Sequence, residues 1–261
     1  MPELHQYITM KPTIIVGKGQ GGQIELGNTI NELGYETFLT TGNRFPGDIW
    51  PRDAFVNYNG TYLTSHDEPD HPLGEGGNVV VGKDFAFVSS QGISIFDGIQ
   101  SDMREYRYIL EELGKELLPN IRMHVAPNGF ESNRLMHEHI DYFMLLCPNN
   151  KILMLDTNHT PAAKSQYYDI IAMREGLKLI RYDGSGDVMF PLNACVIPGT
   201  IDTVLLDSKS TKLISILKDE GINAVGVPMP QLGSKTYGKV NCQTNIYYKE
   251  HNVSIEHLLD L

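Results

Sequence analysis

Short apolar stretches separated by turn-forming residues recur along the chain. Each consists of two runs of strand-forming residues around a central turn former such as Asn-Gly or Pro-Gly, which is the pattern of a β-hairpin. The hairpins are expected at residues 54–65, 78–90, 142–156 and 194–207. The last three are each followed by a stretch with apolar residues at helical spacing and then by one more apolar run. The chain therefore contains a repeated unit of strand, strand, helix and strand.

The helices of these units are expected at residues 101–118, 160–178 and 209–221, and the strands after them at 121–126, 179–183 and 222–228. Ser210 and Gly221 are residue types that favour the start and the end of the third helix. The hairpin at 54–65 differs, because the loop 66–77 follows it where the other units have a helix.

The two chain ends together supply one further unit. Residues 13–39 have the pattern of a strand, a helix and a strand, and residues 243–249 have the pattern of a lone strand. If these segments pair, five units result, and units in a ring bury each other's flanks and leave no exposed sheet edge. We therefore predict an α/β fold with a single domain over residues 1–261. It is a five-bladed, pseudo-symmetric β/α propeller, closed by pairing of the N- and C-terminal segments. An open mixed α/β sheet is the alternative that the same local elements allow.

Composition and charge narrow the classes of partner. The 261 residues are 41% hydrophobic and carry a net charge of −11. An acidic chain repels nucleic acid and anionic membranes and suits a cationic ligand, so we expect neither a nucleic-acid nor a membrane partner. No apolar run approaches the about 18 residues of a membrane helix, and the first residues lack a signal-peptide pattern. The three cysteines lie far apart, which favours a reduced, cytoplasmic protein. They are Cys147, Cys195 and Cys242.

In a ring of repeats, equivalent positions of the units meet at one place. The positions directly before the first strand of each unit carry polar residues of a reactive kind. They are Asp53, Glu75, His139 with Asp141, Asn193, and Cys242. We assign no role to Asn193. The other residues supply a thiol, an imidazole and three carboxylates. We expect these groups to converge at one end of a central channel.

These groups together favour a cationic, planar substrate. A thiol is a useful nucleophile only as thiolate, and its ordinary pKa is about 8.5. His139 could carry the proton, and a carboxylate beside it would orient its ring. Further carboxylates repel a thiolate unless the substrate brings a positive charge. A guanidinium fits best, because carboxylates can hold its N–H groups in pairs while its central carbon faces the sulfur.

Each of these residues also has a simpler explanation. Asp53 could complete a turn, Glu75 could lie in a solvated glycine-rich loop, and Cys242 could be an inert buried thiol. A zinc site is the sharpest chemical alternative, because histidines and a carboxylate alternate along one short stretch with two more histidines in a loop. Its candidate ligands are His66, His71, His137, His139 and Asp141.

Four short motifs occur along the chain in this order: "WPRDAF", "EGGN", "HID" and "NCQTN". They resemble those of the guanidino-group-modifying enzymes, which include arginine and agmatine deiminases, dimethylarginine dimethylaminohydrolases and amidinotransferases. The resemblance covers nearly the whole chain. It implies the five-bladed β/α propeller known as the pentein fold, and it implies that no metal or organic cofactor is needed.

The resemblance also implies roles by position. Asp53 and Asp141 would hold the guanidinium, and His139 would be the general acid and base, supported by Glu75. Cys242 would be the nucleophile and would form a covalent thiouronium adduct.

The rest of the substrate is less well defined by the sequence. Arg44 and Arg134 lie near the motifs and are candidates to bind a substrate carboxylate. Asn78, which ends the "EGGN" motif, is a further candidate for substrate binding. Only Gly238 stands where many relatives have a run of glycines before the cysteine, so the substrate class stays open.

We therefore expect a cysteine-dependent hydrolase that acts on the guanidino carbon of arginine, agmatine or a methylated arginine. An amidinotransferase that moves the amidino group to an amine is the first alternative. A non-catalytic binding module of the same fold and a zinc hydrolase are the others. The sequence does not indicate the oligomeric state.

Overall fold

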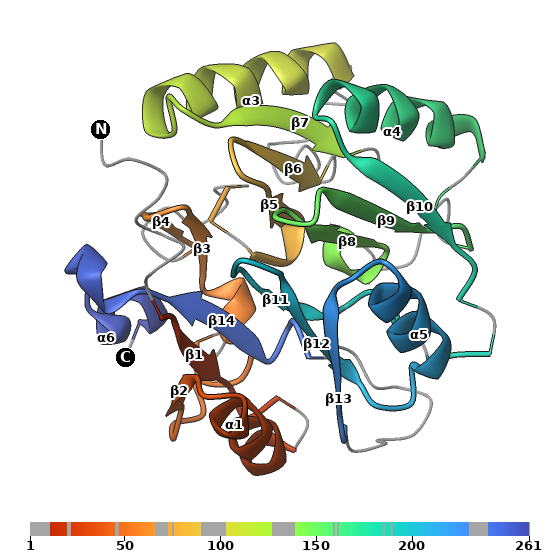
Figure 1. Ribbon diagram of the computed structural model, residues 1–261. Helices are drawn as coiled ribbons and strands as arrows, with labels where there is room; N and C mark the ends of the chain where they lie inside the picture. The colour runs from red at the N-terminus through yellow and green to blue at the C-terminus, as the bar shows by residue number, and fades with distance from the viewer. Residues whose placement is uncertain are drawn as a thin grey trace.

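The fold is built from five small sheets and five helices within the part of the chain that the structure describes (Figure 1). This computed structural model describes residues 11–19, 22–44, 47–65, 73–74, 76–89, 103–126, 139–158, 160, 162–184, 186–188, 190–229 and 240–260. The helices are α1 (Gln23–Glu32), α3 (Met103–Leu117), α4 (Ala162–Arg174), α5 (Thr211–Asp219) and α6 (Ile255–Leu259). They lie at the periphery, and the strands lie toward the centre. Among the described residues, none of the helices has the length and apolar character that crossing a membrane requires.

Three of the sheets share one topology, in which an antiparallel hairpin is followed by a helix and a third strand parallel to the second. Their strands are β5 (Val79–Val81), β6 (Phe85–Ser89) and β7 (Arg122–Ala126); β8 (Met144–Cys147), β9 (Ile152–Asp156) and β10 (Lys178–Tyr182); and β11 (Cys195–Ile197), β12 (Thr203–Asp207) and β13 (Asn223–Val227). The helices α3, α4 and α5 make the respective crossovers. A two-stranded hairpin, β3 (Phe55–Tyr58) with β4 (Thr61–Thr64), precedes them. The mixed α/β units predicted from the pattern are thus present.

The two ends of the chain meet in the fifth sheet, as predicted. The C-terminal strand β14 (Thr244–Tyr247) pairs antiparallel with β1 (Thr13–Val16), and β2 (Glu36–Leu39) pairs parallel on the other side of β1. The register sets Thr13 opposite Tyr247 and Val16 opposite Thr244. Helix α1 connects β1 to β2, so this sheet has the same arrangement as the other three-stranded sheets, assembled from segments more than 200 residues apart in the sequence.

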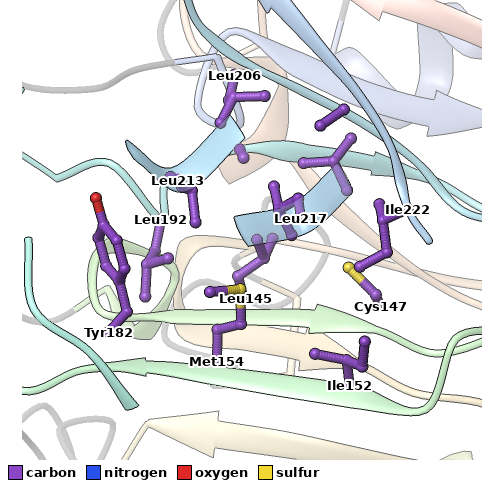
Figure 2. Packing of buried hydrophobic residues seen from close by; sticks show 13 residues of the cluster. Leu145, Cys147, Ile152, Met154, Tyr182, Leu192, Leu206, Leu213, Leu217 and Ile222 are labelled. Carbon is purple, nitrogen blue, oxygen red and sulfur yellow. The ribbon is translucent and has the colours of Figure 1, made fainter. Parts of the chain in front are cut away.

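Five strands are buried along their whole length: β8, and the middle strands β1, β6, β9 and β12 of the three-stranded sheets. In β8, Leu145 and Cys147 join a cluster with α5, whereas Met144 and Leu146 join a cluster with β6 and α4. Successive side chains of a strand point to opposite faces, so a strand buried on both sides needs a continuous apolar run. Figure 2 shows the first of these clusters, where the side chains of β8 and β9 meet those of α5.

Five such clusters join the sheets pairwise. One lies between β3 and the sheet of β5, the next between that sheet and the sheet of β8, and the third between the sheets of β8 and β11. A fourth joins the sheet of β11 to β1 and α1. The fifth joins the chain-end sheet to β3, where Ile15 of β1 packs with Phe55 and with Leu258 of α6. Every sheet is therefore packed against two others.

The fifth cluster can be tested by removing one side chain from it. Ile15→Ala should lower the free energy of unfolding by about 2–5 kcal/mol, because Ile15 is fully buried and the substitution leaves a cavity. Ile24→Ala on α1 is the matched control, since Ile24 is 64% exposed, and it should change stability by about 0.5 kcal/mol or less. Chemical denaturation measures both. Equal losses in the two variants would contradict the packing of the chain-end sheet against β3.

Candidate functional site

Single turns of 3-10 helix stand directly before the first strands of three sheets and pack against one another. They are Pro51–Asp53 before β3, Gly76–Asn78 before β5 and Ile140–Tyr142 before β8. Pro51 presets the backbone angle at the first position of its turn. Because the turns occupy equivalent places in their sheets, Asp53, Asn78 and Asp141 are gathered at one end of the molecule.

Cys242 lies in the turn before β14 and is brought to this group by the pairing of the chain ends. The residue is 2% exposed, and its Sγ lies 3.9 Å from Oδ2 of Asp141, to which the thiol donates. Nδ2 of the neighbouring Asn241 donates to the same Oδ2 at 2.8 Å. The nucleophile and the carboxylate predicted from separate motifs are thus in contact.

His139 is placed between the same groups. Its Nδ1 lies 3.9 Å from Oδ1 of Asp53, and its side chain is 20% exposed. Gly77 leaves room for the ring, since a Cβ at that position would overlap Nδ1 of His139. The second glycine of the "EGGN" motif is therefore explained by the close approach of the His139 ring to the backbone. The structure therefore brings together Cys242, His139, Asp53 and Asp141.

Aromatic rings form one wall of the site. The ring of His139 stacks on that of Tyr142 at 5.8 Å, and Tyr142 stacks on Phe190 at 4.5 Å. Tyr142 and Phe190 form a small buried cluster with Cys242, and Trp50 packs against it. Phe190 has a left-handed backbone, with φ of 55°, which is unusual for a bulky residue and marks a fixed conformation at the site.

The electrostatics of the free protein disfavour the thiolate. Burial, together with the negative charge of Asp141, raises the pKa of the Cys242 thiol to about 11, and a hydrogen bond with His139 acts in the opposite direction. Burial also raises the pKa of the Asp141 carboxyl, while the positive charges of His139 and Arg52 oppose that shift. Burial raises the pKa of the Tyr142 hydroxyl beside the sulfur, so this residue stays neutral. In the free protein these effects together favour the neutral thiol at Cys242.

The remaining predicted residues are placed as follows. Asn78 is 5% exposed within its turn beside Gly77. The guanidinium of Arg44 donates to the carbonyl of Asp260 at 2.9 Å and lies 3.7 Å from Asp48. Glu75 and Arg134 lie outside the described residues, and so do His66, His71 and His137 of the zinc alternative. Within the described part of the chain, no group of three or more His, Cys, Asp and Glu residues could hold a metal ion.

Sequence reasoning gave no role to several residues that contact the site. Asn193, fully buried before β11, donates from Nδ2 to Sγ of Cys242 at 3.3 Å. Its position before a first strand was the available signal, equivalent to that of Asp53 and Asp141. Tyr142 and Phe190 carried no such signal, because an aromatic residue in an apolar stretch usually belongs to the core.

A cavity of about 760 Å³ borders the site at Asp141 and reaches the hairpin turns, while Cys242, His139 and Asp53 do not line it. Residues from the first strands of all five sheets line it: Asn57 of β3, Val80 of β5, Leu145 of β8, Val196 of β11 and Asn245 of β14. Its lining also includes Arg52, Asp141 and Asn241, which lie before those strands. Asp141 therefore belongs both to the wall of this cavity and to the contacts of Cys242.

No family model matches the sequence, and no curated protein matches it in sequence. Solved structures do match. The chain is similar to ArgZ, an arginine dihydrolase from the ornithine-ammonia cycle in cyanobacteria, with a TM-score of 0.62 and 14% identity over 90% of this chain and 39% of that one. It is similar to the dimethylarginine dimethylaminohydrolase from Pseudomonas aeruginosa, with a TM-score of 0.57 and 12% identity over 91% and 100% of the two chains.

The chain is also similar to SxtG, an amidinotransferase of the saxitoxin pathway from Microseira wollei, with a TM-score of 0.57 and 12% identity over 90% of this chain and 93% of that one. It spans about two fifths of the length of ArgZ and nearly all of the other two. At these identities the likeness shows the fold. That fold is the one of guanidino-modifying enzymes, hydrolases and amidinotransferases alike, as the motifs predicted.

The electrostatic balance at Cys242 can be tested with a neutral reagent. Asp141→Asn removes a negative charge beside the sulfur, so the pKa of Cys242 should fall from about 11 by about one unit or more. The rate of Cys242 alkylation by iodoacetamide, followed against pH by peptide mass spectrometry, should then rise at lower pH than in the unaltered protein. Asp84→Asn at a half-exposed surface position is the control. An unchanged or higher midpoint in Asp141→Asn would contradict the balance described.

Proposed function

We propose that this protein is a cysteine-dependent hydrolase that acts on the guanidino carbon of a small cation such as arginine, agmatine or a methylated arginine. One observation carries the proposal: the buried sulfur of Cys242 lies 3.9 Å from a carboxylate of Asp141, while a second carboxylate, Asp53, lies 3.9 Å from His139. A thiol nucleophile, an imidazole and two carboxylates in one buried place suit a cation that reacts at carbon.

The charges explain why the substrate should be a cation. Burial, together with the negative charges of Asp141 and Asp53, raises the pKa of the Cys242 thiol to about 11 and so holds it in its neutral form. A guanidinium paired with Asp53 and Asp141 offsets their charge and favours the thiolate. The nucleophile is then activated by the substrate that it attacks. A neutral substrate would leave the sulfur protonated at neutral pH.

The first half of the reaction forms a covalent adduct. The thiol proton passes to His139, and the thiolate attacks the central carbon of the guanidinium to give a tetrahedral intermediate. His139 then donates a proton to the leaving nitrogen, and the carbon–nitrogen bond breaks. Ammonia or an alkylamine departs and leaves a thiouronium group on Cys242.

The second half regenerates the enzyme. His139 takes a proton from a water molecule, whose oxygen attacks the carbon of the adduct. The carbon–sulfur bond then breaks, and Cys242 leaves as a thiolate that takes up a proton. The product carries a ureido group in place of the guanidinium.

Glu75 would support His139, and Asn78 would help to bind the substrate. Arg134 stays a proposed carboxylate ligand, whereas the contacts of Arg44 with Asp48 and Asp260 favour a structural role for it.

The proposed architecture is the five-bladed propeller. Two observations support it: five apolar clusters join the sheets pairwise, and the first strands of all five sheets line one cavity. A ring accounts for both, because an open arrangement would leave two sheets with a neighbour on one side only. We propose a reducing, cytoplasmic location from the three cysteines, all of which are buried and free.

Amidino transfer is the outcome that most resembles hydrolysis, since both share the first half of the reaction. The two differ in whether water or an amine attacks the adduct. Similar structures include both kinds of enzyme. We take hydrolysis as the first candidate because its second half needs no reactant besides water, and an added amine separates the two reactions experimentally.

A panel of guanidino compounds tests the proposal. Arginine, agmatine and methylated arginines would be incubated with the protein, with and without glycine as acceptor, and the products read by mass spectrometry. At least one compound should give a ureido product independently of glycine. Cys242→Ser should lower that rate by at least about a thousandfold, because serine is a poor nucleophile here. Cys195→Ala, at another buried thiol, is the control that should retain activity.

Three outcomes would count against the proposal. Product formation that requires the amine would show transfer. Full activity of Cys242→Ser would exclude the covalent route. Turnover of no compound in the panel by a folded protein would favour a binding module.

A further inference from the structure

Asn193 makes two contacts with Cys242 across the boundary between two sheets. Its Nδ2 donates to Sγ of Cys242 at 3.3 Å, and its Oδ1 accepts from the backbone N–H of Cys242 at 3.4 Å. The nitrogen and the oxygen of the Asn193 carboxamide therefore both form hydrogen bonds with Cys242. This fixes which end of the carboxamide faces the sulfur, because only the NH₂ group can donate.

The backbone around Asn193 is also held. Its N–H donates to the carbonyl of Phe190 at 3.1 Å, and its own carbonyl accepts from the N–H of Asn241 at 3.4 Å. The side chain is fully buried. The donor thus reaches the sulfur from a fixed turn, without a reorganisation when the reaction begins.

Two of the polar neighbours of the sulfur, Asp141 and Asn193, respond in opposite ways when it loses its proton. Asp141 accepts from the thiol at 3.9 Å, and this contact becomes repulsive once the sulfur is negative. The amide of Asn193 is a neutral donor, and its hydrogen bond becomes charge-assisted and stronger. An interaction that strengthens as charge develops lowers the barrier of the step in which the charge develops.

We propose that Asn193 is a catalytic residue that stabilises the thiolate of Cys242, both before attack and when the sulfur leaves the adduct. The inference rests on the proposed role of Cys242 as nucleophile. It gives the sheet of β11, which Asn193 precedes, a direct part in the chemistry. The carboxylates and the imidazole come from the other sheets.

A cationic alkylating reagent isolates this role. In 2-chloroacetamidine, the amidinium mimics the guanidinium charge, and attack by the Cys242 thiolate forms a sulfur–carbon bond while the carbon–chlorine bond breaks and chloride leaves. The dependence of the inactivation rate on reagent concentration gives a binding constant and a maximal rate. Asn193 contacts the sulfur, so its loss should change the maximal rate. Loss of a carboxylate should weaken binding.

Two variants separate the donor from the scaffold. Asn193→Ala should lower the maximal rate of inactivation about tenfold or more at pH 8, with the binding constant within about twofold of the unaltered protein. Asn193→Asp keeps the shape and the acceptor for the Cys242 N–H, loses the donor and adds a negative charge. It should lower the maximal rate further. Asn223→Ala, on the exposed edge of β13, should behave as the unaltered protein.

The outcomes are distinct. If Asn193→Asp, folded with an unchanged thermal midpoint, reacts at the unaltered maximal rate, the donor has no role and the inference is wrong. If Asn193→Ala weakens reagent binding in step with the rate, its role is structural and the inference is again wrong. If peptide mapping finds no modification of Cys242 in the unaltered protein, the nucleophile assignment fails first, and this inference with it.

Discussion

The contact between the thiol of Cys242 and the carboxylate of Asp141 is the constraint on which the account depends. In a buried place, a carboxylate 3.9 Å from a sulfur keeps the proton on that sulfur, and the pKa of the thiol is raised to about 11. This pair keeps the thiol protonated and therefore unreactive in the free protein. The negative charge of its carboxylate favours the binding of a cation. In the function that we propose, a guanidinium that binds between the carboxylates would reverse this balance, so that binding and activation would become one event.

The fold brings these groups together from distant parts of the sequence. Each sheet begins with a mostly buried strand, and a short turn precedes that strand. Apolar packing between neighbouring sheets sets the turns against one another. The pairing of β14 with β1 then delivers Cys242 to turns that come more than 100 residues earlier. The chemistry is therefore only as well ordered as the packing of the sheets.

Much of this could be predicted from the sequence, because the hairpins, the helices and the lone C-terminal strand each have a local pattern. Equivalent positions before the first strands then pointed to Asp53, His139, Asp141 and Cys242. What depends on contacts between sheets could not be predicted. The stack of Tyr142 on Phe190 is formed by residues of ordinary core type. The role inferred for Asn193 depends on which end of its amide faces the sulfur.

The role predicted for Arg44 stays a prediction, and its contacts show that a residue close to a motif in sequence can have its partners elsewhere. Its neighbours along the sequence placed it close to Asp53, but Asp48 and the chain end near Asp260 supply its partners. A long cationic side chain can reach several acceptors, so proximity in sequence does not choose among them.

The most direct test of the central claim is an experimental structure of Cys242→Ser with a substrate from the panel bound. The account predicts that the guanidinium lies between Asp53 and Asp141, with its N–H groups paired with their carboxylates and its central carbon facing the side chain of residue 242. A guanidinium bound elsewhere, or bound with its carbon turned away from residue 242, would contradict it.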